Sequence, residues 1–415
     1  MRRFVAVLLV CVLSAAAFAQ APLRLAWWGG DARHAMYNEL ADIYERENPG
    51  VILDREFAGW GPYWERLATQ VAGGNAPDII HMHEAFLTEY ASRGTLLDLT
   101  PFVEDGTLDL SAFPDGIVDA GRVGDTLVMV SLGNSSSGTH FNTRLFDEAG
   151  IPHPTFEWTW ADFEATAIAL SEAHGPGVYG ASDVGGWDAT LELFMRQRGK
   201  TLFDGNALGF EREDLIEYWS MWQRLREAGG VPPAEVTAER GNAPHQDGLL
   251  VHNVIAMQLM SGNQHRIFQQ YSDDELGLTT LPRPNDPTAN PGDVISGAYI
   301  SVSARSRNPV ESVRFINWLV NDPDVAVRYG GEHGPPGSVL MQEVIAEHME
   351  PADQRLMDMM QFIAPTAGLG ETRPQAAGEV LGAFTTVYEE LMFGRHASVE
   401  AAVDAFFAEA DFILN

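Results

Sequence analysis

The sequence predicts an α/β protein that folds as two lobes. Strand and helix patterns alternate from residue 23 onward, and the strands are nearly continuous apolar runs, which is typical of a parallel sheet covered by helices on both faces. A chain of 415 residues is long enough for two domains. The stretch Val128–Ile151 begins as an apolar strand, passes through small polar residues and ends as a helix. We expect this stretch to cross from one lobe to the other.

The first lobe opens with a strand–helix–strand–helix–strand pattern. Its predicted strands are Leu23–Trp28, Val51–Phe57 and Asp78–Met82. Apolar residues with helical spacing separate the first two strands until residues 48–50, Asn-Pro-Gly, end that helix. A second helix is expected to begin near Trp60.

The crossing stretch has signals at both ends. Residues 127–132 are mostly β-formers, whereas residues 133–138 are glycine, asparagine and serine, so we expect a flexible connection there. Asn142 is placed to cap the following helix, and Gly150 is placed to end it.

The remaining chain predicts a helix-rich second lobe and a return to the first. Thr159 and Asp162 have the spacing of a capping box, and Asn308-Pro309 is typical of a helix start. Three helices are expected at the end of the chain. The expected strands are Val254–Leu259, Leu276–Leu281 and Tyr299–Val302. A long loop near a second crossing is expected at Pro282–Gly292.

The first residues have the pattern of an export signal. Arg2 and Arg3 precede an apolar run, too short to span a bilayer, and Ala17-Phe18-Ala19 forms a cleavage site. The only cysteine, Cys11, lies in this run in a poor context for lipid attachment. We therefore expect a free exported protein without disulfides or thiol chemistry.

The charge balance excludes some partners. The formal net charge is −32, and Lys200 is the single lysine. Nucleic acid and anionic membranes are disfavoured because like charges repel. The acidity favours either solubility, as in a salty habitat, or a surface that meets a basic partner.

Several motifs, in order, resemble those of the extracellular solute-binding proteins of sugar ABC transporters, family 1, which are maltose-binding-protein-like. Residues 141–150 contain Phe-Asn, Leu-Phe and Ala-Gly at the spacing of the family's YN-x-x-LF-x-x-AG element. Residues 73–80 are close to the family's A-x-G-x-x-PD turn. Residues 300–323 are similar to a longer family segment that ends in Asp-Pro. Together the similarities extend over nearly the whole chain after residue 19.

This resemblance implies a type II periplasmic-binding-protein fold with a hinge and an interlobe cleft. After a signal peptide at 1–19, lobe I would comprise residues 20–131 and 283–322, and lobe II residues 132–282 and 323–415. The resemblance implies a periplasmic monomer that binds a mono- or oligosaccharide by hinge closure and delivers it to the membrane permease of an ABC importer. It implies no cofactor, no metal and no catalysis.

Motifs for catalysis do not stand out. The serines of residues 133–138 lack the glycines of a nucleophile elbow, and the sequence has no HExxH, Walker or GxGxxG motif. Paired carboxylates of a glycoside hydrolase are a spatial feature that spacing does not reveal. His81 and His83 would share one face of a strand and could reach one metal ion, but no third ligand is near. We favour a strand end that faces a cleft, with Glu84 either binding two sugar hydroxyls or capping a helix.

Tryptophan is the most informative residue type, because sugars stack their C–H faces on aromatic rings. Trp27 and Trp28 end a strand before two glycines, and alternation predicts that one faces the cleft and the other the core. Trp60 lies between glycines and Trp187 follows two, so both are expected to be exposed. Packing in the core is the alternative for each.

Polar candidates lie near the predicted strand ends and crossings. Asp31 and Arg33 follow the first tryptophans, with a solvated loop as the alternative, and Asn134 and His140 flank the first crossing. The candidates from the resemblance and from the C-terminal region are Asn263, Gln264, Tyr299, His333 and Arg373.

Two alternatives to a sugar-binding protein remain open. On the same scaffold, Arg33 and Arg373 would suit a phosphorylated polyol, and Glu84 with nearby tryptophans would suit a polyamine. An exported glycoside hydrolase or lyase is the other alternative, and it predicts that a sugar is turned over.

Overall fold

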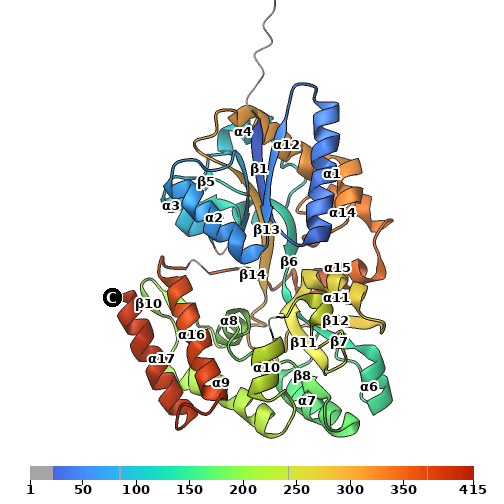
Figure 1. Ribbon diagram of the computed structural model, residues 1–415, viewed down its shortest axis with the longest axis vertical. Helices are drawn as coiled ribbons and strands as arrows, with labels where there is room; N and C mark the ends of the chain where they lie inside the picture. Colours follow the sequence, from blue (N-terminus) through green and yellow to red (C-terminus); the bar gives the residue numbers. More distant parts are fainter. Residues whose placement is uncertain (1–21, 84–85, 242, 372) are drawn as a thin grey trace, which may run out of the picture.

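The computed structural model describes residues 22–83, 86–241, 243–371 and 373–415. Within these ranges the chain forms two α/β lobes, drawn one above the other in Figure 1. The predicted export signal at residues 1–19 and the candidate residue Glu84 lie outside the described residues. Among the helices of the described ranges, none combines the length and apolar character needed to cross a bilayer.

The sheet of lobe I confirms the predicted parallel start. β1 (Leu23–Trp28) pairs in parallel with β2 (Leu53–Ala58) on one side and with β3 (Ile79–His83) on the other. β13 (Val294–Val302) then runs antiparallel to β3, and β6 (Val130–Ser135) runs antiparallel to β13. The predicted strand at 299–302 is therefore the second half of a longer strand.

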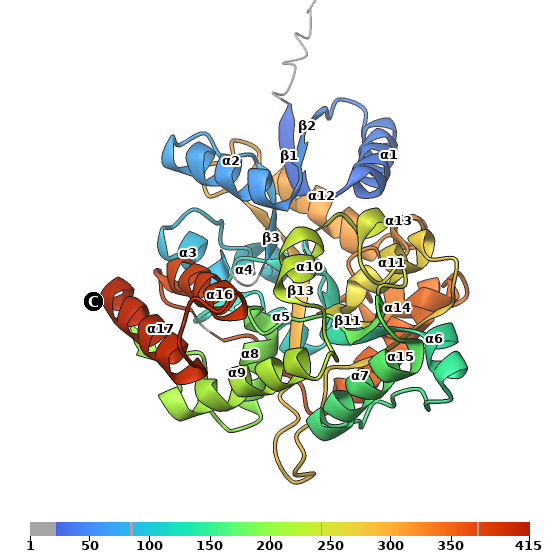
Figure 2. The same ribbon diagram turned by 60° about the horizontal axis from the view of Figure 1, so that its bottom comes forward.

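Helices cover both sides of this sheet. α1 (Asp31–Glu47) and α2 (Trp60–Ala72) lie on opposite sides of β1 in both ribbon views (Figures 1 and 2). The remaining elements of lobe I are the helices α3 (Leu87–Ser92), α4 (Thr100–Glu104), α5 (Asp115–Asp119), α12 (Pro309–Asn321), α13 (Pro323–Tyr329) and α14 (Val339–Ala346), and the short strands β4 (Arg122–Val123), β5 (Thr126–Leu127) and β14 (Gly368–Leu369).

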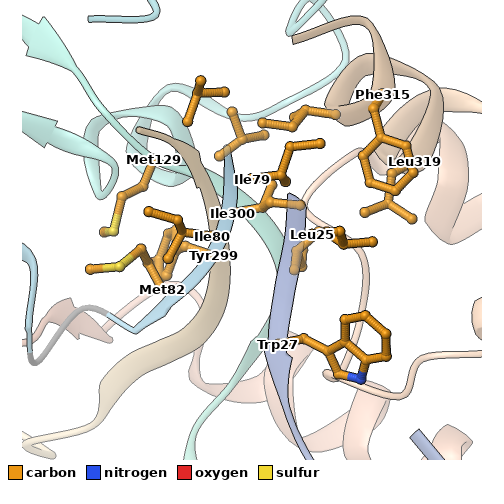
Figure 3. Packing of buried hydrophobic residues seen from close by; sticks show 14 of the residues in the cluster. Leu25, Trp27, Ile79, Ile80, Met82, Met129, Tyr299, Ile300, Phe315 and Leu319 are labelled. Carbon is orange, nitrogen blue, oxygen red and sulfur yellow. The ribbon is translucent and has the colours of Figure 1, made fainter. Parts of the chain in front are cut away.

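The core of lobe I lies along the central strands. Leu25, Ile79, Ile80 and Ile300 are fully buried there, and Figure 3 shows them with Trp27 beside them. Burial of each such side chain stabilises the fold by about 1.5–3 kcal/mol. The apolar runs of the sequence therefore predict this core correctly.

Lobe II is built on a smaller sheet. β7 (Ser137–Asn142) lies between β12 (Leu276–Thr280) and β11 (Ile255–Ser261), antiparallel to both, and β8 (Tyr179–Ala181) pairs in parallel with β11. β11 and β12 confirm two predicted strands. The polar-rich loop expected after β12 is also present, since residues 281–293 contain no helix and no strand.

Helices make up most of lobe II. Two of them, α16 (Ala377–Met392) and α17 (Val399–Leu414), pack side by side at its outer edge in both ribbon views (Figure 2). The other elements are α6 (Thr143–Ala149), α7 (Trp160–His174), α8 (Asp188–Arg196), α9 (Arg212–Glu227), α10 (Ala234–Arg240), α11 (His265–Tyr271), α15 (Pro351–Ile363), the 3-10 helices η2 (His245–Asp247) and η3 (Gly262–Gln264), and the hairpin strands β9 (Phe203–Asp204) and β10 (Ala207–Leu208).

The first crossing between the lobes is more regular than the sequence suggests. Glycine and serine at 133–138 predict a flexible connection, but residues up to Ser135 pair with β13 of lobe I, and residues from Ser137 pair with β11 of lobe II. Only Ser136 separates the two strands, and it is buried. Small side chains are needed here because backbones lie close together: a Cβ at Gly133 or at Gly138 would lie 2.8 or 2.7 Å from a backbone oxygen. The connection is strand up to Ser135 and again from Ser137, and its flexibility stays a prediction.

The packing also bears on the predicted lobe boundaries at 131 and 322. β6 remains in the sheet of lobe I to Ser135. α13 contacts α1 and α12, and its Val325 and Tyr329 are part of the lobe I core. α14 packs on α13, whereas α15 packs on β12 and α11. Drawn by packing, the last boundary between the lobes lies between α14 and α15.

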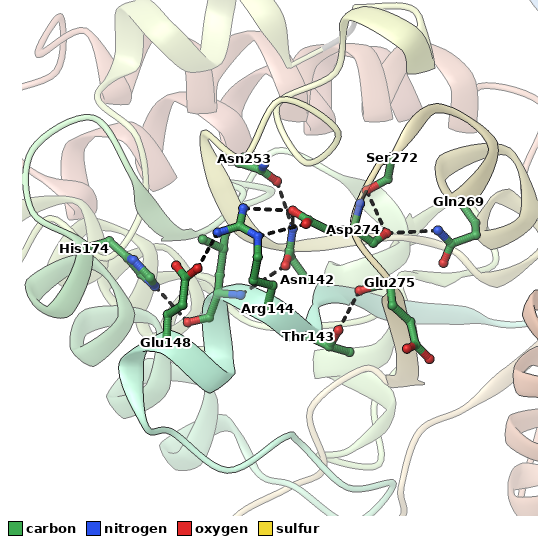
Figure 4. A network of polar contacts seen from close by, with 11 residues as sticks. Asn142, Thr143, Arg144, Glu148, His174, Asn253, Gln269, Ser272, Asp274 and Glu275 are labelled. Atoms are coloured by element: carbon green, nitrogen blue, oxygen red, sulfur yellow. Dashed lines mark hydrogen bonds and ion pairs between the residues drawn. The ribbon is translucent and has the colours of Figure 1, made fainter.

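A polar network holds the end of β7 to the start of β12 in lobe II (Figure 4). Asn142 caps α6 as predicted, because its Oδ1 accepts a hydrogen bond from the Leu145 N–H at 3.1 Å. Its Nδ2 donates to Asp274 at 2.8 Å, and Arg144 donates two hydrogen bonds of 2.8 Å to the same carboxylate. The predicted stop at Gly150, with φ of 67°, is also confirmed.

These donors favour the ionised form of Asp274. The hydrogen bonds from Arg144, followed by the bond from Asn142, lower the pKa of Asp274 to about 2. A carboxyl group whose pKa is lower in the folded than in the unfolded chain stabilises the fold above its unfolded pKa, and this contribution is lost as the pH falls through its folded pKa.

We predict that Asp274→Asn lowers the free energy of unfolding by roughly 1.5–3 kcal/mol at pH 6, because the ion pair with Arg144 is lost and one accepting oxygen is replaced by an NH2 group. Urea denaturation followed by circular dichroism measures this. The difference from wild type should shrink as the pH falls from about 4 toward 2. Asp411→Asn, at an exposed position of α17, is the control. An equal loss of unfolding free energy in both variants at pH 6 would show that the polar network does not stabilise the fold.

Candidate functional site

A cleft of about 570 Å³ lies between the two lobes. Lobe I contributes the start of α2, the end of β3 and the turn from α5 to β4. Lobe II contributes the start of α8. The crossing segments at Ser136–Ser137 and at 294–296 form its floor, and Gly370, Glu371 and Arg373 close one side. The side chains used below are Trp60, Asp119, Arg122, Trp187, Asp188, Glu192, Tyr299, Glu371 and Arg373, all of which line it.

Trp60 presents an aromatic surface on the lobe I wall. It is 46% exposed, and its ring lies edge-on to Trp28 (5.1 Å between centroids) and to His83 (5.4 Å). Beneath it, Trp64 stacks on Phe86 at 3.8 Å. The exposed ring therefore rests on a layer of buried rings, which limits its movement.

Trp187 stands on the lobe II wall, just before α8. Two glycines bring its loop against α16, because a Cβ at Gly185 would lie 2.2 Å from the Tyr388 ring and one at Gly186 would lie 3.0 Å from it. The Trp219 indole N–H donates to the Gly185 carbonyl at 3.1 Å. The glycines that mark this tryptophan in the sequence thus position it at the cleft.

Charged groups line the same wall. Arg373 donates to Asp188 and to Glu192, both at 3.0 Å, and so ties the C-terminal segment to α8. Glu371 accepts a hydrogen bond from the Leu202 N–H at 2.7 Å. Burial raises the pKa of Glu371, and the Glu192 carboxylate raises it further.

Four of the sequence-predicted site residues line the cleft: Trp60, Trp187, Tyr299 and Arg373. They come from α2, the loop before α8, β13 and the C-terminal segment. Tyr299 is only 1% exposed, so it forms part of the floor. The structure brings these four together, and their role in binding stays a prediction.

The candidates near the end of β1 lie elsewhere. Trp27 is fully buried, stacks on Phe57 at 5.0 Å and donates to His34 at 3.1 Å, and Trp28 is buried under Trp60. One indole of the pair thus faces the core and the other supports the cleft wall. Asp31, in the first turn of α1, is exposed away from the residues that line the cleft.

Arg33 and His333 join lobe I to the segment after α13. Arg33 is 8% exposed and pairs with Glu332 at 2.9 Å. His333 lies 3.1 Å from the Tyr37 hydroxyl, and burial holds its pKa well below the usual range. These two candidates are placed in the folded interior rather than on the cleft wall.

Asn134 is buried in the crossing strand, where its side chain accepts a hydrogen bond from the Ser131 hydroxyl at 3.1 Å. Its backbone N–H donates to the Pro335 carbonyl at 2.9 Å. The segment between α13 and α14 is therefore hydrogen-bonded directly to the first crossing.

The lobe II candidates from the crossing region lie behind the cleft. His140 is fully buried, with its Nδ1 3.1 Å from that of His265, and burial lowers its pKa well below the usual range, with a further effect from His265. Asn263 accepts from the hydroxyl of Ser261, which lines the cleft, and Gln264 lies next to it in η3. These three candidates lie behind the cleft lining and do not themselves line it.

The metal-like histidine pattern also has a place in the fold. His81 is fully buried against Tyr37, at 4.7 Å between ring centroids, while the ring of His83 lies against Trp60 at the cleft. In the part of the chain that the structure describes, no three His, Cys, Asp or Glu side chains are placed to hold a metal ion.

Sequence reasoning missed most of the charged lining. Asp119, Arg122, Asp188, Glu192 and Glu371 line the cleft but were not among its candidates. One signal was available, since Asp188 and Glu192 follow Trp187 and share a helix face at a spacing of four residues. Glu371 and Arg122 have no such local signal.

The fold and cleft define a two-lobed solute-binding protein. Residues 30–326 match the family described as bacterial extracellular solute-binding protein, and the chain belongs to this family. The resemblance seen in the short motifs is thus confirmed.

Individual relatives agree with this assignment. A lipoprotein from the oleD 5′ region of Streptomyces antibioticus is 25% identical over 341 residues, which covers 76% of this chain and 71% of that protein. A periplasmic oligogalacturonide-binding protein of Yersinia enterocolitica, solved with saturated digalacturonic acid, superposes with a TM-score of 0.83 at 21% identity and covers 95% of this chain and 98% of its own. A substrate-binding protein of Listeria monocytogenes, solved with cycloalternan, superposes with a TM-score of 0.79 at 20% identity. That match covers 94% of this chain and 97% of the Listeria chain. These likenesses confirm the predicted two-lobed fold.

We predict that Gly334→Ala destabilises the protein by about 1–3 kcal/mol or more, since a Cβ there would lie 2.0 Å from the Asn134 carbonyl oxygen and Gly334 has φ of +91°. Urea denaturation followed by tryptophan fluorescence measures the loss. Gly382→Ala, in open space on α16, should be neutral or stabilising by up to about 1 kcal/mol. Equal stability of the two variants would show that the crossing tolerates a side chain.

Proposed function

We propose that this protein is the substrate-binding component of an ABC importer and binds a mono- or oligosaccharide in the interlobe cleft. In this proposal the protein is exported to the periplasm, with its signal peptide cleaved near Ala19, acts as a monomer and delivers the sugar to the membrane permease. The observation that carries the proposal is the pair of tryptophans, Trp60 and Trp187, that line one cleft from opposite lobes. The Yersinia and Listeria neighbours, whose structures hold oligosaccharides, support a ligand of this class.

The chemistry of the lining suits a sugar. Aromatic faces stack against sugar C–H groups, and each such contact contributes roughly 1–2 kcal/mol. The carboxylates of Asp188 and Glu371 and the hydroxyls of Ser136 and Ser137 can bond the hydroxyls in the ring plane. A Kd near 1 μM requires about −8 kcal/mol, which two stacked rings and several hydrogen bonds can supply after the ordering cost.

Hinge closure follows from contacts on both lobes. A sugar that touches Trp60 and Trp187 together binds the closed arrangement better than the open one, so it shifts the population toward closure. Because Ser136 alone separates β6 from β7, the rotation would be confined to few residues at that crossing.

The phosphorylated-polyol alternative has less support, and the polyamine alternative stays open. A phosphorylated polyol needs an available arginine, but Arg33 pairs with Glu332 away from the cleft and Arg373 pairs with two carboxylates. The polyamine alternative relied on Glu84, which lies outside the described residues. The family is one of binding proteins, and we propose that a bound sugar is released unchanged.

We predict that a binding saccharide stabilises the mature protein by about 2.7 kcal/mol at 100 times its Kd, and a thermal-shift screen measures this. Trp60→Ala and Trp187→Ala should each raise that Kd about 5- to 30-fold, because each loses one stacking contact. Phe412→Ala, at an 80% exposed ring of α17, is the control and should bind normally. A sugar that is hydrolysed during incubation would favour the glycoside hydrolase alternative instead.

A further inference from the structure

The lobe II wall of the cleft holds a carboxylate that is buried and incompletely paired. Glu192 is 5% exposed, and its Oε2 accepts the hydrogen bond from Arg373. Its Oε1 has no hydrogen-bond partner among the described residues, and Arg196 Nη1 lies 4.0 Å away. A buried carboxylate oxygen without a donor is costly, so such groups in native proteins call for an explanation.

A second carboxylate beside it has the same feature. Glu371 lines the cleft as well, and its Oε2 accepts from the Leu202 N–H while its Oε1 has no hydrogen-bond partner among the described residues. The two carboxylates are close enough for Glu192 to raise the pKa of Glu371. This part of the wall therefore concentrates negative charge.

The arginines of the lining are already occupied. Arg373 holds Asp188 and Glu192, and Arg122 holds Asp119 at 3.4 Å. The lining thus has four carboxylates, Asp119, Asp188, Glu192 and Glu371, against these two guanidinium groups. Arg196, 4.0 Å from Glu192 Oε1, is a third cation behind the wall, so one carboxylate remains in excess. Recognition of an anionic sugar requires a cation that can bind its carboxylate, usually a bidentate arginine.

We infer that the cleft selects an uncharged saccharide over a uronate, with Glu192 and Glu371 as the residues that determine this selectivity. This inference rests on the proposed function and adds the charge class of the ligand. A uronate carboxylate would enter a cleft with excess negative charge, beside the buried carboxylate of Glu192, where like charges repel. A neutral sugar brings only hydroxyls, and these can donate to the carboxylates.

The test compares matched ligands that differ in one carboxylate. Isothermal titration calorimetry at pH 7 and about 20 mM salt, where screening is weak, would use 1,4-linked disaccharides of glucose, galactose and mannose and the same disaccharides with carboxylates at C6. We expect a neutral member to bind and its uronate counterpart to bind at least about tenfold more weakly.

Charge-removing variants assign the selectivity to the two residues. Glu192→Gln and Glu371→Gln keep the side-chain shape. At least one of them should lower the ratio of the uronate Kd to the neutral-sugar Kd about tenfold. Two positions are tested because Glu192→Gln also weakens the Arg373 pair. Glu409→Gln, at an exposed position of α17, changes the net charge equally and should leave the ratio unchanged.

The outcomes separate this inference from the function on which it rests. The inferred selectivity would be wrong if a uronate binds as tightly as its neutral partner. It would also be wrong if neither cleft variant changes the ratio of the two Kd values. In both cases the proposed sugar-binding function would stand. Binding of spermidine with no binding of any saccharide would overturn the proposed function itself.

Discussion

The arrangement of the molecule depends on backbone hydrogen bonding across the first crossing. β6 is paired in the sheet of lobe I and β7 in the sheet of lobe II, so the chain passes between the lobes with Ser136 alone outside the two strands. The segment between α13 and α14 packs on this crossing so closely that Gly133 and Gly334 have no room for a Cβ. The positions of the two cleft walls, and hence of Trp60 and Trp187, follow from this short connection.

Features set by neighbouring residues could be predicted from the sequence. The strands of the parallel sheet, the Asn142 cap and the Thr159 capping box are local patterns, and all are present. At 133–138 the strand pairing was not predictable, because glycine and serine favour loops in isolation. Pairing with β13, which is more than 150 residues away, overrides that preference.

The site was predictable only in part, because its members meet through the fold. Trp60 and Trp187 carry neighbouring glycines, a local signal of exposure, and both line the cleft. Trp60 is exposed there, whereas Trp187 is half-buried against the core of lobe II. Trp27 and Trp28 also precede glycines, but Phe57 and Trp60, from other elements, cover them. His140 and His333 are buried by partners 125 and 296 residues away. No local pattern contains that information.

Net charge and cleft charge are separate properties of this chain. The overall value of −32 comes mostly from solvated surface groups, whose fields are screened over about 10 Å in 0.1 M salt. Glu192 lies in the wall of a partly closed cleft, where screening is weaker and each charge acts more strongly on a bound ligand. A substitution on the surface therefore alters solubility and encounter, whereas a substitution at Glu192 or Glu371 alters which ligand the cleft accepts. The acidity of the sequence alone does not distinguish these two effects, because it does not show which carboxylates are desolvated in the folded protein.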